Sequence, residues 1–462
     1  MKTLTLAEVA AAVGGRLVGG APDAVITGAT ADSREVTAGD LFVAIVGERV
    51  DGHDYAQAAF AAGAGAILGQ RALDGPTIVV EDPIVALGKL AGHLLSLLPN
   101  LDVVAVTGSS GKTSTKDLLA AVVADRGPVV APIGSFNTEV GLPLTVLRCD
   151  EETRTLVLEM GARGVGHIEY LCKIAQPQVG IVLNVGSAHV GEFGSRDAIA
   201  RAKAELPASL PADGVAVLNA DDPRVAAMTS TARKLTFGAS QAADVRFEHL
   251  QLDDRIRPRF ELSYGADRAA VQLLTAGEHQ ASNAAAVAAA AFALGMSFED
   301  VVAGLERAEI VSRWRMEVGD TPSGVTIIND AYNANPESMT AALKALAEFG
   351  RNRPDSTTWA VLGEMKELGE DTVAEHDRLG RLAVRLHIHR LIAVGDGARA
   401  LHLGAVQEGS WDGESQWVPD ANAAAEVLRE ATSAGDIVLV KASRAVGLEA
   451  VAQTLLTEER SN

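Results

Sequence analysis

Cysteine is scarce in this chain, and its scarcity excludes two kinds of stabilised fold. Only Cys149 and Cys172 occur among the 462 residues. Two cysteines are too few for a zinc tetrad or for a disulfide framework. We therefore expect both thiols to be reduced and buried.

Long apolar runs are also missing. No stretch of about 18 uninterrupted apolar residues occurs, which argues against a membrane-spanning helix. Residues 1–17 carry one early lysine and an apolar pattern broken by polar residues, so they resemble an amphipathic helix rather than a secretory signal. These two absences predict a cytoplasmic protein.

Positive charge is in short supply relative to negative charge. The chain has 40 Lys and Arg residues and 60 Asp and Glu residues, which gives a formal net charge of -20. Nucleic acids and anionic membranes are bound by clustered Lys and Arg, so this balance disfavours both as partners. A phosphorylated ligand stays possible where positive charge is concentrated locally.

The residues that are abundant predict a multidomain α/β protein. The composition, 48% hydrophobic and 22% charged, is typical of a soluble globular protein, and 462 residues are too many for one ordinary core. Short apolar strands alternate with Ala- and Leu-rich helical stretches, the pattern of helices packed on a mainly parallel sheet. The absence of a short fixed-period repeat argues against a solenoid.

Three domains are expected, at 1–98, 99–312 and 313–462. The first has a helix over 6–13 and a strand over 40–44, as in a small α/β domain. The third has strands separated by helices, which suggests a doubly wound fold. The other expected elements are strands at 101–106, 155–160, 179–185, 214–219, 325–329, 359–363, 391–394 and 436–440, and helices at 112–124 and 282–294.

A glycine-rich segment between the predicted strand 101–106 and helix 112–124 has the features of a phosphate-binding loop. Such a turn lets backbone N–H groups approach phosphates, and the helix adds its positive dipole end. Lys112 can neutralise the β- and γ-phosphates, and Thr113 offers a hydroxyl to Mg2+. Val106 replaces the usual first glycine, so a structural turn with an incidental lysine is the alternative. The context favours nucleotide binding by Gly108, Ser109, Ser110, Gly111, Lys112, Thr113 and Ser114.

The loop sequence Thr-Gly-x-x-Gly-Lys-Thr resembles that of the Mur ligases and of the folylpolyglutamate synthetases. Asp32-Ser33-Arg34 resembles the uridine-diphosphate-binding N-terminal domain of the Mur ligases, which the synthetases lack. Glu364 and Ala442 depart from the usual Asp and Gly without removing a charge. Further segments that resemble the Mur ligase family are 39–42, 51–53, 277–283, 315–317, 330–338, 362–369 with His376, and 441–444.

The resemblance implies a three-domain architecture, with a central P-loop-type parallel sheet for ATP and a C-terminal Rossmann-like domain for ATP and D-alanyl-D-alanine. Segment 330–338 is close to the signature of the D-alanyl-D-alanine-adding members. The implied activity is ATP-dependent joining of D-alanyl-D-alanine to UDP-N-acetylmuramoyl-tripeptide through an acyl phosphate, by a monomer. The implied contacts to the UDP substrate are Ser33, Arg34 and Asn137.

Two residues at strand ends are candidate metal ligands. Glu159 ends an apolar strand, where an unpaired carboxylate would be costly to bury, so it needs a partner. His189 follows the predicted strand 179–185, where α/β proteins place ligand-binding residues. A salt-bridged Glu159 and a solvent-exposed His189 are the alternatives. The resemblance implies instead that Glu159, with Thr113, and His189 bind Mg2+, and that both have catalytic roles with Lys112.

Lys203 lies in a helix-compatible segment shortly after His189. Its position resembles that of the lysine that carries a carbamate in related ligases. A carbamate would turn a cation into an oxygen-donating anion that suits Mg2+. The alternative is a surface lysine paired with Glu205 or with another carboxylate of the helix.

The remaining candidate ATP contacts lie far along the chain. His279 and Asn283 are four residues apart and share one helix face, although a simple helix cap is the alternative. The resemblance implies that both contact the nucleotide, together with Arg315, Asp330, Tyr332 and Asn333.

Two other functions stay open on the sequence. One is the ligase that adds the third amino acid, and the other is a nucleotide-binding protein of this fold that catalyses nothing. Asp221-Asp222-Pro223-Arg224 is similar to the segment with which diaminopimelate-adding ligases bind their amino acid. Because it directly follows the predicted strand 214–219, we expect a turn there rather than an acceptor site.

Overall fold

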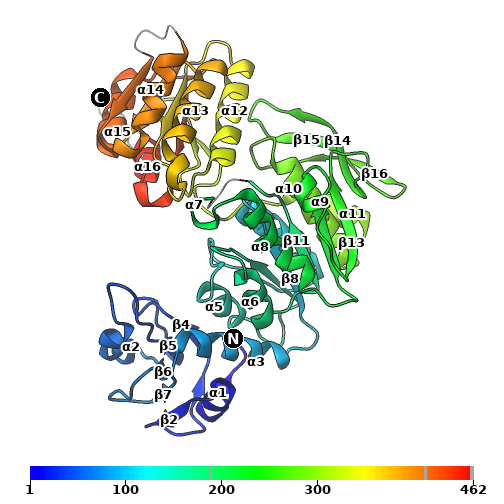
Figure 1. Ribbon diagram of the computed structural model, residues 1–462, viewed down its shortest axis with the longest axis vertical. Helices are drawn as coiled ribbons and strands as arrows, with labels where there is room; N and C mark the ends of the chain where they lie inside the picture. Colours follow the sequence, from blue (N-terminus) through cyan, green and yellow to red (C-terminus); the bar gives the residue numbers. More distant parts are fainter. Residues whose placement is uncertain (187–189, 410–413, 458–462) are drawn as a thin grey trace.

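The protein is a mixed α/β chain built on three main sheets. The computed structural model describes residues 1–186, 190–409 and 414–457. Within them a five-stranded, a nine-stranded and a six-stranded sheet follow one another along the sequence and along the long axis of the molecule (Figure 1). Among the described residues, no helix is long and apolar enough to cross a membrane.

The N-terminal sheet has the strand order β2-β7-β6-β5-β4, parallel except for β2. Helix α1 begins with a capping box in which Thr5 and Glu8 bond each other's backbone N–H groups, and Asp82 caps α3. The elements of this part are β1 (Leu4–Thr5), α1 (Leu6–Val13), β2 (Arg16–Val18), β3 (Val25–Ile26), β4 (Gly28–Thr30), β5 (Asp40–Val43), α2 (Ala56–Ala61), β6 (Ala66–Gly69), β7 (Thr77–Val79) and α3 (Pro83–Ser96).

The central sheet has the order β16-β15-β14-β13-β12-β11-β8-β10-β9, so β8 lies between two parallel neighbours. Its strands are β8 (Asp102–Thr107), β9 (Val129–Val130), β10 (Thr155–Glu159), β11 (Val179–Val182), β12 (Val215–Asn219), β13 (Arg233–Gly238), β14 (Val245–Leu252), β15 (Pro258–Tyr264) and β16 (Asp267–Gln272). Its helices are α4 (Lys112–Val123), α5 (Gly141–Val146), α6 (His167–Ile174), α7 (Val190–Phe193), α8 (Arg196–Ala208), α9 (Pro223–Ala226), α10 (Gln280–Ala293) and α11 (Phe298–Arg307).

The alanine-rich helix α10 is buried in the core of the central part of the chain. It contacts α4, α11 and several strands of the central sheet, and its alanines from Ala284 to Ala291 are fully buried. Alanine has the highest helix propensity, and its side chain is a single methyl group. Neighbouring elements can therefore pack closely around most sides of an alanine-rich helix. The Ala-rich segment is therefore a core helix rather than a surface one.

The C-terminal sheet has the order β17-β18-β22-β19-β20-β21 and is parallel except for the edge strand β17. The carboxyl ends of parallel neighbours lie at one edge, so Asp330 after β18 and Lys441 at the end of β22 are brought together. The elements are β17 (Glu317–Asp320), β18 (Thr326–Asn329), α12 (Pro336–Asn352), β19 (Thr358–Leu362), α13 (Thr372–Arg385), β20 (Arg390–Val394), α14 (Arg399–Glu408), β21 (Ser415–Val418), α15 (Ala421–Ala431), β22 (Ile437–Lys441) and α16 (Glu449–Thr457).

The expected strands and helices are confirmed, with ends displaced by a few residues. The largest change is at the predicted strand 179–185, which ends at Val182 because Asn184 turns toward the phosphate loop. Both cysteines are free and buried, and burial raises the pKa of each thiol to about 12. The turn predicted at 221–224 is also confirmed, since Asp222 caps α9.

Candidate active site

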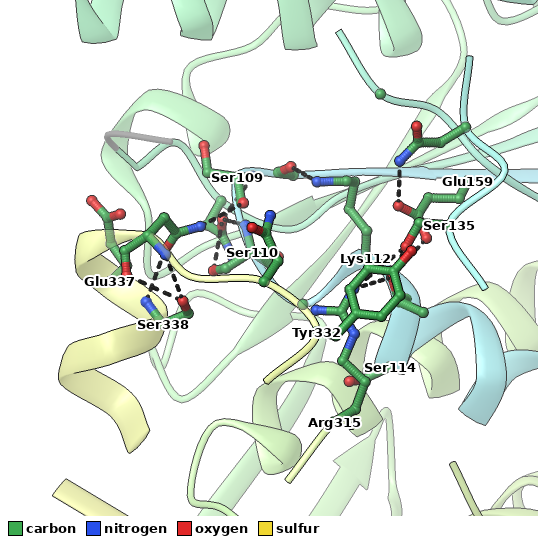
Figure 2. Close-up of a pocket in the computed structure, with 18 of the residues that line it drawn as sticks. Ser109, Ser110, Lys112, Ser114, Ser135, Glu159, Arg315, Tyr332, Glu337 and Ser338 are labelled. Atoms are coloured by element: carbon green, nitrogen blue, oxygen red, sulfur yellow. Dashed lines mark hydrogen bonds between the residues drawn. The ribbon is translucent and has the colours of Figure 1, made fainter. Parts of the chain in front are cut away.

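A cavity of about 600 Å³ is lined by residues of both the central and the C-terminal sheets. Its walls include the glycine-rich loop after β8, the segment after β18, and the carboxyl end of β22. Figure 2 shows Lys112, Ser135 and Glu159 around the same space as Arg315 and Tyr332. The predicted site residues on its wall are Gly108, Ser109, Ser110, Gly111, Lys112, Thr113, Ser114, Asn137, Glu159, Lys203, His279, Asn283, Arg315, Asp330, Tyr332 and Asn333.

The glycine-rich loop is held in shape by Asn184. The backbone N–H groups of Ser109 and Ser110 both donate to Asn184 Oδ1, at 3.0 Å each. The first N–H groups of a helix have no partner within it, so the first turn of α4 is left to receive an anion. Gly111 has φ +83°, and a Cβ there would lie 2.8 Å from the Oδ1 of Asn283, so this position requires glycine.

Lys112 begins α4 and folds back over the loop. Its ammonium donates to the carbonyl oxygen of Gly108 at 2.8 Å. Burial lowers the pKa of Lys112, an effect that the nearby Glu159 charge partly offsets. The site therefore has the half-buried ammonium of Lys112 beside the free end of the helix.

Glu159 lies at the end of β10 and is almost fully buried, with 1% of its surface exposed. Thr113 Oγ1 donates to one carboxylate oxygen at 2.9 Å, and Asn137 Nδ2 donates to the other at 2.7 Å. No Lys or Arg in the described part of the chain forms an ion pair with it, so the salt-bridge alternative is wrong for those residues. A buried carboxylate held only by neutral groups keeps its capacity to bind a cation.

Arg315, from the C-terminal part of the chain, contacts the hydroxyls of Thr113 and Ser135. Its guanidinium donates to Thr113 Oγ1 at 3.0 Å and lies 3.4 Å from Ser135 Oγ. The carbon Cζ also stacks 4.1 Å from the ring centre of Tyr332. Its Nε is buried and has no hydrogen-bond partner among the described residues.

Lys203 lies in α8, is 7% exposed, and lines the cavity. Burial, followed by the positive charge of Lys112, lowers its pKa well below the ordinary lysine value. Its ammonium has no hydrogen-bond or ion-pair partner within residues 1–186, 190–409 and 414–457. Pairing with Glu205 is excluded, because that carboxylate accepts the N–H groups of Gly166 and Glu169 at the start of α6.

On the C-terminal side of the cavity, the ammonium of Lys441 binds the segment that follows β18. This ammonium contacts Asp330 Oδ2 at 2.6 Å and the carbonyl oxygen of Asn333 at 2.8 Å. His279 is close enough for both charges to act on it, and burial lowers its pKa. His279 occupies the N-cap position of α10, as the helix-cap alternative expects, but its side chain makes no capping bond. Asn335 completes the junction by donating to the carbonyl oxygen of Ser109 at 3.4 Å.

Two predicted residues lie away from this assembly. Ser33 and Arg34 lie between β4 and β5 of the N-terminal sheet, where Arg34 is exposed and paired with Asp32 at 2.6 Å. His189 lies outside the described residues. The sequence reasoning missed the positioning role of Asn184 and the cavity residues Ser135, Asn335 and Lys441. Asn335 and Lys441 lie within the recognised segments 330–338 and 441–444 but were assigned no role, and no local pattern marks Ser135 or Asn184.

Comparison with known proteins agrees with this geometry. Residues 106–291 match the Mur ligase middle domain, 314–444 the Mur ligase glutamate ligase domain, and 25–91 the Mur ligase family catalytic domain. The chain is 48% identical to the UDP-N-acetylmuramoyl-tripeptide–D-alanyl-D-alanine ligase of Mycobacterium tuberculosis, over 99% of each chain.

Two solved structures are also similar over nearly the whole chain. MurF from Acinetobacter baumannii is 32% identical, with a TM-score of 0.88 over 99% of this chain and 100% of that one. MurF from Thermotoga maritima, in complex with ADP, is 32% identical, with a TM-score of 0.80 over 93% of this chain and 97% of the other.

Proposed function

Because the chain belongs to the Mur ligase family, we propose that it joins D-alanyl-D-alanine to UDP-N-acetylmuramoyl-tripeptide at the expense of ATP. The product is the UDP-N-acetylmuramoyl-pentapeptide used in peptidoglycan synthesis. The observation that carries the proposal is one cavity in which Lys112, the buried Glu159 and the C-terminal Arg315 meet. ATP activates a carboxylate in that cavity, and the amine of the dipeptide then attacks it.

The two chemical steps balance without any further reactant. A carboxylate oxygen of the tripeptide attacks the γ-phosphorus of ATP, ADP leaves, and an acyl phosphate forms. The amine of D-alanyl-D-alanine then attacks the acyl carbon, phosphate leaves, and the amine loses a proton. Lys112 and Arg315 supply the positive charge that two anionic substrates need in order to approach each other.

We assign the three parts of the chain to the three substrates. Residues 1–98, with Ser33 and Arg34, bind the UDP end of the donor. Residues 99–312 bind the phosphates of ATP, and residues 313–462 bind the rest of ATP and the dipeptide. Support comes from Ile84 at the start of α3, which lies on the wall of the same cavity as Lys112 and so connects the N-terminal part to the phosphate loop.

Magnesium fits the side of the cavity that Glu159 occupies. The carboxylate and the Thr113 hydroxyl are hard oxygen donors, and the carboxylate is buried without a paired cation among the described residues. Within the same residues no three His, Cys, Asp or Glu side chains gather as a metal-binding group. This agrees with Mg2+, which is commonly held by one or two carboxylates and the substrate phosphates. When bound, the ion would screen the triphosphate from the incoming carboxylate.

A carbamate on Lys203 fits the same region. An isolated buried ammonium costs several kcal/mol, and the described residues offer Lys203 no counter-charge. Carbon dioxide adds to the neutral amine and one proton is released, so the lowered pKa of Lys203 favours the reaction. The resulting anion would be an oxygen donor for Mg2+, beside the cation Lys112.

The ligase that adds the third amino acid is the less favoured alternative. Its acceptor-binding segment would correspond to residues 221–224, but those side chains are used within the fold. Asp221 accepts the N–H groups of Ala239 and Ser240, and Asp222 accepts those that start α9. The two carboxylates of this turn are therefore engaged within the fold, and Arg224 pairs with Asp197 at 3.2 Å.

An acceptor screen tests the proposed function. Phosphate release from ATP is measured with UDP-muramoyl dipeptide or tripeptide, each offered single amino acids or D-alanyl-D-alanine. We expect release only with the tripeptide and D-alanyl-D-alanine together, since both substrates are needed to discharge the acyl phosphate. Strong activity with the dipeptide and a free amino acid would assign the chain to the alternative ligase. Release independent of both substrates would contradict any ligase function.

A further inference from the structure

Helix α4 carries a buried ion pair, Lys116–Asp117, that the proposed chemistry does not use. The ammonium lies 2.5 Å from a carboxylate oxygen, and the two side chains are 1% and 2% exposed. Burying two charges costs several kcal/mol each, and replacing such pairs by apolar residues is often neutral or stabilising. Stability alone therefore gives little reason for a buried pair at this position.

The bonds of the pair connect α4 to two segments distant in sequence. Lys116 Nζ also donates to the carbonyl oxygen of Pro132 at 2.9 Å and to Ser312 Oγ at 3.3 Å. The second carboxylate oxygen of Asp117 accepts the backbone N–H of Ser312 at 2.9 Å. Two contacts of the ammonium and one carboxylate oxygen thus hold these segments on α4, and the other carboxylate oxygen binds the ammonium itself.

Both segments lead within three residues to side chains of the cavity. Pro132 precedes Ser135, and Ser312 precedes Arg315. Ser135 Oγ and Arg315 Nη2 each lie 3.0 Å from Thr113 Oγ1, which is one helical turn before the pair. The Lys116–Asp117 pair therefore binds the first residues of two segments, and a later residue of each segment contacts the Thr113 hydroxyl.

The backbone around Arg315 is held in an unfavourable conformation. Trp314 and Met316, its neighbours on either side, have φ values of +60° and +52°. Non-glycine residues seldom adopt this left-handed conformation, and they persist in it only where the surroundings hold them. The downstream hold is visible, since Met316 N–H donates to Asp330 Oδ1 at 3.2 Å. Trp314 is held by Glu317, which accepts its N–H at 3.2 Å, and by the N–H of Tyr332, which donates to its carbonyl oxygen at 3.3 Å. Two residues upstream, the bond from Ser312 to Asp117 anchors the segment on α4.

We propose that the Lys116–Asp117 pair positions Arg315, by anchoring residues 312–315 on the helix that bears the phosphate loop. The pair does not touch substrate. It acts through Arg315, whose guanidinium it keeps on Thr113 and over the nucleotide phosphates. This inference rests on the proposed ATP-dependent reaction, in which Arg315 supplies positive charge.

A double-mutant cycle distinguishes positioning from a general structural role. Asp117→Asn keeps the size of the side chain and removes its charge, and Arg315→Gln removes the group through which the pair is proposed to act. We expect Asp117→Asn to lower kcat/KM for ATP by about tenfold in the wild-type background. In the Arg315→Gln background the same change should have less than about a twofold effect, since coupled residues are not additive. Effects that multiply in the double variant would overturn the proposal.

Asp436→Asn is the matched control. Asp436 is a buried carboxylate that accepts the N–H groups of Thr357 and Ser433 and the indole N–H of Trp359, at the end of β22 away from Lys441. Its substitution should lower the melting temperature without changing kcat/KM for ATP. If Asp117→Asn does not fold, Ser312→Pro replaces it in the cycle. That variant removes both the N–H donor and the hydroxyl of the half-buried Ser312, and it leaves the contact between Lys116 and Asp117 in place.

The affinity for a non-hydrolysable ATP analogue, measured across the same cycle, separates this inference from the proposed function. Wild-type protein that binds the analogue but never ligates would contradict the proposed function, and the coupling in analogue affinity would still test the pair. Wild-type protein that ligates, with independent Asp117 and Arg315 effects on both quantities, would contradict the pair's positioning role alone.

Discussion

Replacing Lys112 by alanine is expected to lower turnover by about a thousandfold or more while leaving the fold intact. The lost ammonium lies at the first turn of α4, where we propose that the γ-phosphate is transferred. Removing one charge-stabilising group of this kind typically costs about 10²- to 10³-fold. Its only hydrogen bond in the described part of the chain is to the carbonyl oxygen of Gly108, so little structure is lost. Steady-state kinetics would measure the loss of turnover, and thermal melting would show whether the fold is intact.

Lys234→Ala is the control for Lys112→Ala. Lys234 also donates to a backbone carbonyl, that of Met228 at 2.6 Å, but it lies on β13 outside the cavity. It should keep near-normal turnover. If Lys112→Ala did the same with unchanged ATP affinity, the phosphate site would have been assigned wrongly.

Replacing Lys203 by alanine is the second large expected effect. Most activity should be lost, because the proposed carbamate is removed as an oxygen donor for Mg2+. The melting temperature should not fall as it does for a core truncation, since the side chain has no described polar partner to leave behind. Acetate, added as a short carboxylate, should restore part of the activity by filling the vacated space.

The rescue must be specific to position 203. Acetate should leave Lys112→Ala inactive, because that variant lacks a cation rather than an anion. Full activity of Lys203→Ala without any additive would rule out the carbamate. A loss of activity that acetate does not relieve, together with a folded protein, would assign Lys203 a role as an ammonium instead.

Local sequence patterns were sufficient to predict those parts of the site that are formed by consecutive residues. The strand–loop–helix around Lys112 has a glycine that the backbone conformation requires, and that requirement is visible in the sequence. Glu159 was identified because a carboxylate at the end of an apolar strand needs a partner. The structure supplies that partner as the hydroxyl of Thr113.

The parts that could not be predicted depend on contacts between distant residues. Asn184 holds the loop across 74 or 75 positions of sequence, and Ser312 reaches Asp117 across 195. An asparagine after a strand or a serine in a linker has many ordinary roles, so residue type gives no signal. Likewise, the spacing of Lys203 and Glu205 along α8 does not show whether they pair. The Glu205 carboxylate binds the start of α6, a neighbour that is known only from the fold.

Transfer of an oxygen label tests the central claim most directly. UDP-muramoyl tripeptide labelled with ¹⁸O in its terminal carboxylate is converted with ATP and D-alanyl-D-alanine, and the products are analysed by mass spectrometry. If ATP phosphorylates the carboxylate in the cavity, each phosphate released carries one ¹⁸O atom and the pentapeptide product retains the other. Pentapeptide formed with unlabelled phosphate, or with the label in AMP, would contradict the acyl-phosphate reaction that we assign to this site.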